Sequence, residues 1–498
     1  GELQVHRIDL RTKAAVGRLD FRTGERLNKA VDEATWWMAD AQGRPRLAFL
    51  TRKDGDHVLM HGRDKDFREV LNFDDDDTHF RPIALSADGE RIYGLSDEGR
   101  EQRDLVEFDP ATRSIVRTIY SKPGVDIAGI RVDDTGELVA AAFYQDGLLA
   151  SAYFDRDSGL LDRSLRAAFP GKAVSLLQRS RDAQQAIVAV SGSDRPLEIY
   201  HYDHPQRRAA LISEMQPWLA ERTFAPAHTI KAKSKDGFEI EAYLTLPPTA
   251  GEAKRPLIVL AHGGPIGVRD DRFFDPEVQF MASLGYAVLQ VNFRGSEGFG
   301  TAFRKAGERS YGTTIGDDID AAIAAALAQY PLDATRMCTA GSSYGGYSAM
   351  ASAIRWPGRF RCAISMFGVS DRALFFTASD SGRSEEARKE MEKVLGNPNV
   401  DMDEMKASSP VYRYADLQVP LLLIHGTEDK RVDYEHARRI ARMLEIAGRP
   451  PILIELDGEG HGIATAQNRR KAWSAVAGFL RKHLGDPLAK SAAPAVGR

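Results

Sequence analysis

Short runs of β-branched and aromatic residues, broken by polar turns, fill residues 1–225. Four of these turns are alike and read "ADAQGRP", "SADGERI", "DDTGELV" and "SRDAQQA". Their central positions are 46, 47 and 47 residues apart and are occupied by Gly43, Gly89, Gly136 and Ala183. A second feature repeats at nearly the same interval: predicted strands end at an aspartate, namely Asp9, Asp109, Asp155 and Asp203. A blade of four antiparallel strands has this length, so the pattern predicts an all-β propeller.

The constant period favours blades over the alternative, a β-sandwich with regular hairpins. Four full blades and a leading strand are few for a closed ring, so we expect further blades upstream of Gly1. The chain begins at that glycine with neither a methionine nor a signal-like segment. The sequence thus predicts a partial propeller over residues 1–225, incomplete at its N-terminus.

The pattern changes after about Thr229, where near-continuous apolar runs alternate with helical stretches. Runs such as "PLIVLAHGG", "YAVLQVNF" and "PLLLIHG" are typical of parallel strands that are covered on both faces. Between the runs, "DDIDAAIAAALAQY" and "DYEHARRIARMLEIAG" show the helical period. The alternation predicts a doubly wound, mostly parallel α/β sheet over residues 226–485. Residues 486–498 are small and polar, and we expect them to be disordered.

The segment "MCTAGSSYGGYSAMA" places two serines between glycines, directly after an apolar run and before a helical stretch. A nucleophile on a tight strand-to-helix turn needs small residues two positions before and two after it. Gly341 and Gly345 stand at that spacing from Ser343, whereas the corresponding positions for Ser342 are Ala340 and a tyrosine. Ser343 is therefore the candidate nucleophile. A purely structural glycine-rich turn is the alternative reading of this segment.

A serine nucleophile needs a histidine to accept its proton and a carboxylate to orient that histidine, and in this arrangement both follow the serine in the chain. His461 lies in the glycine-rich loop "DGEGHGI" after the last apolar run, and we predict it to be the base. His436 is expected on a helix in solvent, and His425 beneath the site. Three acids follow the preceding run, and the residues alone leave the choice open among Glu428, Asp429 and Asp433.

The oxyanion formed by the attack needs hydrogen-bond donors that already point at it. Gly263 and Gly264 in "AHGGPIG" allow backbone amides to approach closely, and the amide of Tyr344, next to the nucleophile, is the expected further donor. The alternative is that His-Gly-Gly-Pro forms a simple turn. Beside the serine turn, we expect an oxyanion hole.

Composition narrows the classes of partner. The net charge is −4, and the chain has no basic stripe interleaved with aromatic residues, so we expect no nucleic-acid partner. No apolar stretch reaches about 18 residues, which argues against a membrane partner and for a soluble protein. The sequence does not decide between a cytoplasmic and a periplasmic location. Cys338 and Cys362 each lie in an apolar run, the usual place of a free thiol, so neither a disulfide nor a metal site is predicted.

With these pieces in order, the chain resembles the prolyl oligopeptidase family of serine peptidases, particularly its acylaminoacyl-peptidase-like branch. The resemblance covers residues 1 to about 485 and rests on six motifs in the family's order. The motifs read "SKDGFEIEAYLTLP", "LAHGGP", "NFRGSEGFG", "GSSYGGY", "HGTEDKRV" and "GEGHG". The resemblance implies a β-propeller that caps an α/β-hydrolase domain. It also implies the triad Ser343, Asp429 and His461, which decides among the three acids.

The resemblance further implies that Arg431 holds a carbonyl of the substrate and that Val432 lies on a wall of the pocket. Asp433 departs from the proline or small residue that is frequent at its position. Family members that use a tyrosine hydroxyl in the oxyanion hole have it where His262 stands here, so we rely on backbone donors.

The implied activity is hydrolysis of short peptides through an acyl-enzyme, without a cofactor or metal, in a protein that can form homo-oligomers. The propeller would restrict the size of the substrate. A carboxylesterase with the same triad is the first alternative, and an aryl ester compared with a peptide anilide would separate the two. A binding module without a competent triad is the second alternative, which labelling by a fluorophosphonate would test.

Overall fold

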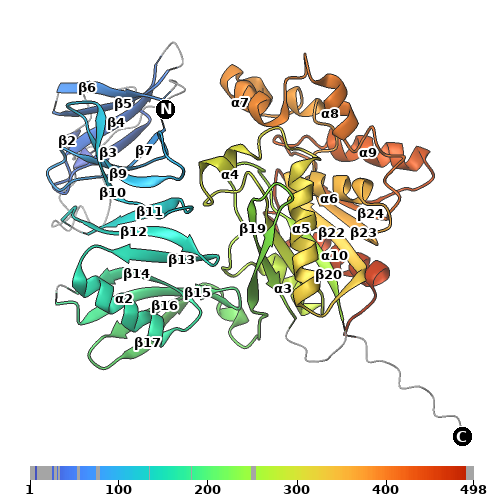
Figure 1. Cartoon of the computed structure of the whole chain (residues 1–498), viewed down its shortest axis with the longest axis horizontal. Coiled ribbons are helices and arrows are strands. Elements are labelled where there is room, and N and C mark those ends of the chain that lie inside the picture. The colour runs from blue at the N-terminus through green and yellow to red at the C-terminus, as the bar shows by residue number, and fades with distance from the viewer. Residues whose placement is uncertain are drawn as a thin grey trace, which may run out of the picture. The chain divides into compact units, whose positions relative to one another are not determined.

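The computed structural model describes residues 6–7, 25–26, 31, 34–52, 56–64, 66–73, 79–133, 135–180, 182–247 and 254–488. Figure 1 shows small antiparallel sheets in the N-terminal half of the chain and a larger sheet with helices in the C-terminal half. Contacts group the chain into two compact units. The first contains Gly1–Gln145, Leu149–Leu165 and Gly298–Thr301, and the second contains the remaining residues.

The small sheets are formed by strands that follow one another in the chain. A pair, β1 (His6–Arg7) and β2 (Glu25–Arg26), comes first. The next sheets contain β3 (Trp36–Ala39), β4 (Pro45–Thr51), β5 (His57–Arg63) and β6 (Asp66–Asn72), then β7 (Phe80–Leu85), β8 (Ile92–Ser96), β9 (Asp104–Asp109) and β10 (Ser114–Tyr120). The last two contain β11 (Ile127–Val132), β12 (Leu138–Gln145) and β13 (Leu148–Tyr153), then β14 (Ala173–Arg179), β15 (Gln185–Gly192), β16 (Arg195–Asp203) and β17 (Arg208–Glu214).

The predicted repeat is confirmed at its turns. Each marker residue lies between the first and second strands of a sheet, and all four have a positive φ: 72° at Gly43, 74° at Gly89, 84° at Gly136 and 55° at Ala183. In each turn the marker's amide donates to the carbonyl three residues earlier, for example from Gly89 to Ser86 at 2.8 Å. Glycine is favoured there because it adopts a positive φ without strain. The sheets are blades of a β-propeller.

The third blade differs from the four-stranded prediction. Its sheet contains β11, β12 and β13, and the helix α2 (Arg156–Ala168) follows where a fourth strand was expected. Asp155, one of the predicted strand-end marks, accepts a hydrogen bond from the amide of Ser158 at 2.8 Å. Leu161 and Leu165 are four residues apart and buried, so this segment follows the helical period. Asp9 lies outside the described residues.

The C-terminal sheet has eight strands in the order β18-β19-β21-β20-β22-β23-β24-β25. Pairing is antiparallel among β18, β19 and β21 and parallel from β21 onward, which confirms the mostly parallel α/β-hydrolase fold. The strands are β18 (Ala227–Lys233), β19 (Glu239–Thr245), β20 (Arg255–Ala261), β21 (Ala287–Asn292), β22 (Leu332–Ser342), β23 (Cys362–Met366), β24 (Leu421–Gly426) and β25 (Ile452–Leu456).

Helices cover both faces of this sheet (Figure 1). Those used below are α3 (Pro276–Ser283), α5 (Thr314–Gln329), α6 (Tyr344–Arg355), α9 (Glu435–Ile446) and α10 (Ala466–Leu484), together with the 3-10 helix η1 (Pro217–Leu219). One core packs α3 and α10 against side chains such as Ile258, Ile364 and Leu422. The other core packs α6 and α9 against neighbours such as Ala363 and Leu423. Both faces are therefore buried, as the continuous apolar runs predict.

Cys338 and Cys362 correct one expectation. They occupy paired positions on the adjacent strands β22 and β23, with Cα atoms 4.9 Å apart, and the structure joins them as a disulfide. Apolar surroundings indicate burial but carry no information on which cysteines face each other across a sheet.

The predicted domain boundary at residue 225 stays a prediction. The sheet type changes between Glu214 and Ala227, whereas contacts group the last small sheet with the second unit. Of the predicted tail, residues 489–498 lie outside the described part of the chain. Among the helices of the described residues, none has both the length and the hydropathy that a membrane crossing requires.

Candidate active site

Ser343 is the single residue between the end of β22 and the start of α6. Its φ of 58° and ψ of −119° lie where residues other than glycine are strained. Its amide donates to the carbonyl of Met366 at 2.9 Å, and its carbonyl accepts from the amide of Tyr347 at 3.1 Å. These bonds hold the serine on a sharp strand-to-helix turn of the kind that exposes a nucleophile.

The glycines on either side of this serine are required by close backbone contacts. A Cβ atom on Gly341 would lie 2.5 Å from the carbonyl oxygen of Ala261, and one on Gly345 would overlap the same oxygen. Side chains at these two positions would push the turn away from strand β20. The spacing rule that selected Ser343 over Ser342 therefore has a direct steric cause in this structure.

Asp429 and His461 meet across two loops that follow β24 and β25. The Nδ1 atom of His461 lies 2.7 Å from Oδ2 of Asp429. Oδ1 of the same carboxylate accepts the amides of Arg431 at 2.9 Å and Val432 at 3.0 Å. Burial opposes ionisation of Asp429, but the hydrogen bonds from His425, His461 and the Val432 amide outweigh it and hold its pKa far below the ordinary value. Because an ionised carboxylate only accepts, Nδ1 of His461 carries the proton and Nε2 is free to accept one.

The loop that carries His461 is anchored by Glu459, which is 3% exposed. Its carboxylate accepts the amides of Ala464 at 2.8 Å and Thr465 at 2.9 Å, and the Asn468 side-chain amide at 2.9 Å. The hydroxyl of Thr465 also donates to it, at 2.6 Å. These bonds, led by that of the Thr465 hydroxyl, lower the pKa of Glu459 to about 2. The start of α10 is thereby tied to the residue two positions before His461.

The predicted oxyanion donors lie beside the nucleophile. A Cβ atom on Gly263 would approach Cβ of Ser343 to 3.4 Å, so the two residues are in contact range. Gly264 has a φ of 114°, and it lines the same cavity as Ser343 and Tyr344. The sequence-predicted donors are therefore gathered around the serine. Their role in binding an oxyanion stays a prediction.

His262 is buried, and both of its ring nitrogens have hydrogen-bonding partners. Its Nδ1 lies 2.7 Å from the carbonyl oxygen of Gly263, and its Nε2 lies 2.8 Å from Oγ of Ser296. Burial lowers its pKa to about 4, so the ring is neutral near pH 7. A neutral ring has one proton, which Nδ1 donates to the Gly263 carbonyl.

A cavity of about 920 Å³ is lined by the candidate serine and histidine. Ser343, Gly264, Tyr344 and His461 line it on one side. Its remaining wall is largely apolar and includes Ile266, Tyr311, Val369, Phe375, Met391 and Leu395. Within the described residues, no group of three or more His, Cys, Asp or Glu side chains is arranged to hold a metal ion.

Arg431 and Val432 differ from each other in what they contact. Arg431 lines the cavity and forms a two-pronged ion pair with Asp380, with distances of 2.8 and 3.2 Å. Val432 is fully buried and does not line the cavity, which corrects its predicted place on the pocket wall. Its position has a physical reason, since its amide donates to Asp429 and its carbonyl accepts from Nε2 of His425 at 2.7 Å.

The sequence matches a known family over the catalytic half. Residues 272–487 match the model of the prolyl oligopeptidase family, and this segment includes Ser343, Asp429 and His461. The catalytic part of the chain is thus similar to the prolyl oligopeptidase family. This match, together with the names of the relatives, identifies a serine-type peptidase.

Curated relatives in the family extend beyond this chain. The dipeptidyl aminopeptidase BIII of Pseudoxanthomonas mexicana is 29% identical over 95% of this chain and 70% of the relative. The dipeptidyl peptidase family member 6 of Caenorhabditis elegans is 27% identical over 88% of this chain and 64% of the relative. The chain thus spans about two thirds of the length of these relatives.

Solved structures share the fold. A puromycin-hydrolyzing peptidase of Mycobacterium tuberculosis superposes with a TM-score of 0.72 at 22% identity, covering 94% of this chain and 72% of that one. The acylaminoacyl peptidase of Pyrococcus horikoshii superposes with a TM-score of 0.70 at 20% identity, covering 89% of this chain and 70% of that one.

Three polar residues beside the predicted family triad were not predicted as part of the site. His425 was expected beneath the site, and its Nε2 indeed lies 3.4 Å from Oδ2 of Asp429, but the bond to the acid was not foreseen. Glu459 and Asp380 carry no signal in the sequence, because their partners are known only once the chain has folded. His436 was expected in solvent, yet it is fully buried and burial lowers its pKa to about 3.

Proposed function

We propose that this chain hydrolyses short peptides through an acyl-enzyme on Ser343, with His461 as general base and Asp429 as the residue that orients it. The observation that carries the proposal is the strained turn of Ser343 in one cavity with a histidine whose Nδ1 is held by an ionised carboxylate. The family and the names of the relatives support a serine peptidase acting on short peptides.

In the proposed mechanism, Oγ of Ser343 attacks the carbonyl carbon and its proton passes to Nε2 of His461. The oxyanion forms beside the amides of Gly263, Gly264 and Tyr344, and the loss of one such donor typically costs about 2.7–4 kcal/mol of barrier. The C–N bond then breaks as His461 returns the proton to the leaving nitrogen. Water attacks the resulting ester, gives a proton to His461, and releases the acid while Ser343 regains its hydrogen.

The apolar wall of the 920 Å³ cavity suits an apolar side chain on the residue before the cleaved bond. Arg431 lines this cavity in an ion pair with Asp380, and about half of the arginine side chain is exposed. We propose that Arg431 exchanges part of this pairing for a carbonyl oxygen of the substrate. The propeller is proposed to restrict access to short or unfolded chains, since blades surround a narrow central channel.

The first experiment labels the purified chain with a fluorophosphonate and repeats the labelling with Ser343→Ala. We expect a covalent adduct on the first protein and none on the second. Hydrolysis of a peptide anilide compared with an aryl ester of the same acyl group distinguishes a peptidase from an esterase. A peptide series of increasing length, with a folded protein as the last member, tests the size restriction. Equal digestion of short peptides and the folded protein would contradict it.

A further inference from the structure

A second cavity of about 980 Å³ lies in the same compact unit as the catalytic residues. It reaches the catalytic loops from residues that flank the triad: Ser342 precedes the nucleophile, and Gly462 and Ile463 follow the base. Phe367 also lines it, and the ring centroid of this residue is 5.7 Å from that of His461. Ser343 and His461 therefore line the first cavity, and their immediate neighbours in the chain line the second.

The chemistry assigns different parts of a peptide to these two spaces. Ser343 and two of the proposed oxyanion donors, Gly264 and Tyr344, line the first cavity, so the acyl part of the substrate belongs there. The leaving nitrogen receives its proton from His461 and must therefore depart on the side of that ring. Gly462 and Ile463, directly after the base, open onto the second cavity. Resting on the function proposed above, we propose that the second cavity binds the leaving peptide and that its arginines hold that peptide's C-terminal carboxylate.

Aromatic side chains form much of the second cavity. Phe224 and Phe274 meet edge to face with ring centroids 4.8 Å apart, and Phe280 and Trp473 do so at 5.4 Å. Trp218 of η1 also lines the space, and 74% of its surface is exposed. Concave, largely apolar sites of about 300–1,000 Å³ are typical of small ligands. This lining suits apolar side chains on a short leaving peptide.

Charge identifies the end of the peptide that this cavity fits. Three arginines line it, Arg222, Arg469 and Arg470, against one acid, Glu277. Arg469 donates to the carbonyl of Ile463 at 3.1 Å. Among the described residues, Arg222 and Arg470 have no ion pair or side-chain hydrogen bond. A free guanidinium presents paired N–H groups that match a carboxylate.

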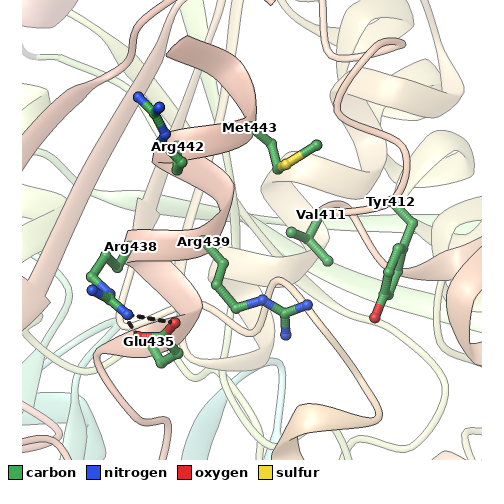
Figure 2. Close-up of a pocket in the computed structure, with 7 residues that line it drawn as sticks. All are labelled: Val411, Tyr412, Glu435, Arg438, Arg439, Arg442 and Met443. Atoms are coloured by element: carbon green, nitrogen blue, oxygen red, sulfur yellow. Dashed lines mark hydrogen bonds and ion pairs between the residues drawn. The ribbon is translucent and has the colours of Figure 1, made fainter. Parts of the chain in front are cut away.

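Another arginine-lined hollow on the molecule shows the opposite arrangement. Figure 2 shows this space of about 470 Å³ on α9, where Arg438 is bonded to Glu435. Arg439 is paired with Asp371, and Arg442 with Glu445 at 3.2 Å. The cations of that hollow are already neutralised by neighbouring acids. Of these two hollows, the cavity beside the catalytic loops is the one that combines unpaired arginines with an aromatic wall and lies next to residues that follow His461.

The test uses three substrates with one acyl part, acetyl-Ala-Phe. The leaving groups are Phe-Ala with a free carboxylate, Phe-Ala amide, and p-nitroaniline. We expect kcat/KM to be about fivefold higher for the free carboxylate than for the amide, the size of a favourable exposed charge interaction. In the double variant Arg222→Gln/Arg470→Gln this ratio should fall to about one. Hydrolysis of the anilide, which has no carboxylate, should be unchanged and shows that the variant is folded.

Arg442→Gln serves as the matched control, because it removes an exposed arginine from the hollow on α9 and should keep the fivefold ratio. The inference would be overturned if the carboxylate-to-amide ratio of kcat/KM were near one in the wild-type protein, or if it stayed near five in the double variant. Hydrolysis of the anilide in the same experiments would still support the proposed function. If the wild-type protein cleaves none of the three substrates, both the proposed function and this inference are overturned.

Discussion

The turn that carries Ser343 and the two loops that carry Asp429 and His461 are held in place by different means. The serine turn depends on the absence of side chains at Gly341 and Gly345, because a Cβ atom at either position would clash with the Ala261 carbonyl. The loops are fixed by hydrogen bonds to buried carboxylates. A steric requirement leaves a visible spacing in the sequence, whereas a hydrogen bond joins residues whose sequence separation is arbitrary. The two regions should accordingly respond differently to substitution.

The largest effect is expected at the serine itself. Ser343→Ala should reduce kcat by about 10⁶, as the loss of a triad member does in serine peptidases, without change in the circular dichroism spectrum. Ser342→Ala should retain most of the activity on the peptide anilide. Similar kinetics for the two variants would mean that the turn presents the wrong serine.

In the loops, Asp429→Asn should lower kcat by about 10⁴, because an amide no longer fixes the proton on Nδ1 of His461. Glu428→Gln and Asp433→Asn are the matched controls and should change kcat by less than tenfold. The side chain of Asp433 accepts the amide of Glu435 at 2.9 Å, so its replacement affects the start of α9 instead of the base. A severe loss in Asp433→Asn would contradict this division of roles.

Gly345→Ala tests the steric side of the comparison. The added methyl overlaps the Ala261 carbonyl, and displacing a catalytic turn by about 1 Å can cost about 10² in rate. Gly460→Ala is the control, since a Cβ atom there meets nothing within 4 Å although it is adjacent to His461. We expect kcat and the melting temperature to fall in the first variant and to stay near wild type in the second.

A smaller effect is expected at His425, whose Nε2 lies 3.4 Å from the same Asp429 oxygen that His461 contacts. His425→Phe keeps a ring but removes the donor, and kcat should fall about tenfold with KM unchanged. His425→Gln supplies an amide N–H that can reach the Val432 carbonyl and should recover part of the loss. Equal loss of kcat in both variants would indicate a packing role alone.

The smallest effect on kcat is expected at Glu459. Its folded-state pKa of about 2 is depressed from 4.5, so its contribution to stability is complete above the unfolded pKa and is lost as the pH falls toward 2. The difference in melting temperature between wild type and Glu459→Gln should therefore be constant near neutral pH and shrink below about pH 4.5. A difference that grows at low pH would contradict the ionised state assigned here.

The difference between steric requirements and hydrogen bonds explains which features could be predicted from the sequence. The blade turns were visible because each needs a positive φ, which selects glycine at three of the four positions. The serine was visible because its glycine neighbours are sterically required. The choice of Asp429 among three acids needed the family motif, since the loop sequence alone offers three equivalent carboxylates.

What was missed depends on distant partners. The helix α2 in place of a strand, the pairing of Cys338 with Cys362, and the burial of His436 are decided by elements that pack together only after folding. The contact between His425 and Asp429 was missed for another reason: both residues lie in one short motif, but the motif does not show which way the loop after β24 turns their side chains. The periodicity of apolar residues indicates which face of a helix or strand is buried, but it does not identify the residues that contact that face.

The anchor at Glu459 has a consequence for the order in which activity arises during synthesis. The turn of Ser343 and the loop of Asp429 are complete once β24 and its neighbours have left the ribosome. The loop of His461 lacks its attachment until Asn468 and the first turn of α10 have emerged, because Glu459 binds them. Chains fold progressively from the N-terminus as they are made. A nascent chain thus carries Ser343 for an interval before the loop of His461 is attached, and we expect hydrolysis to begin only after the first turn of α10 has emerged.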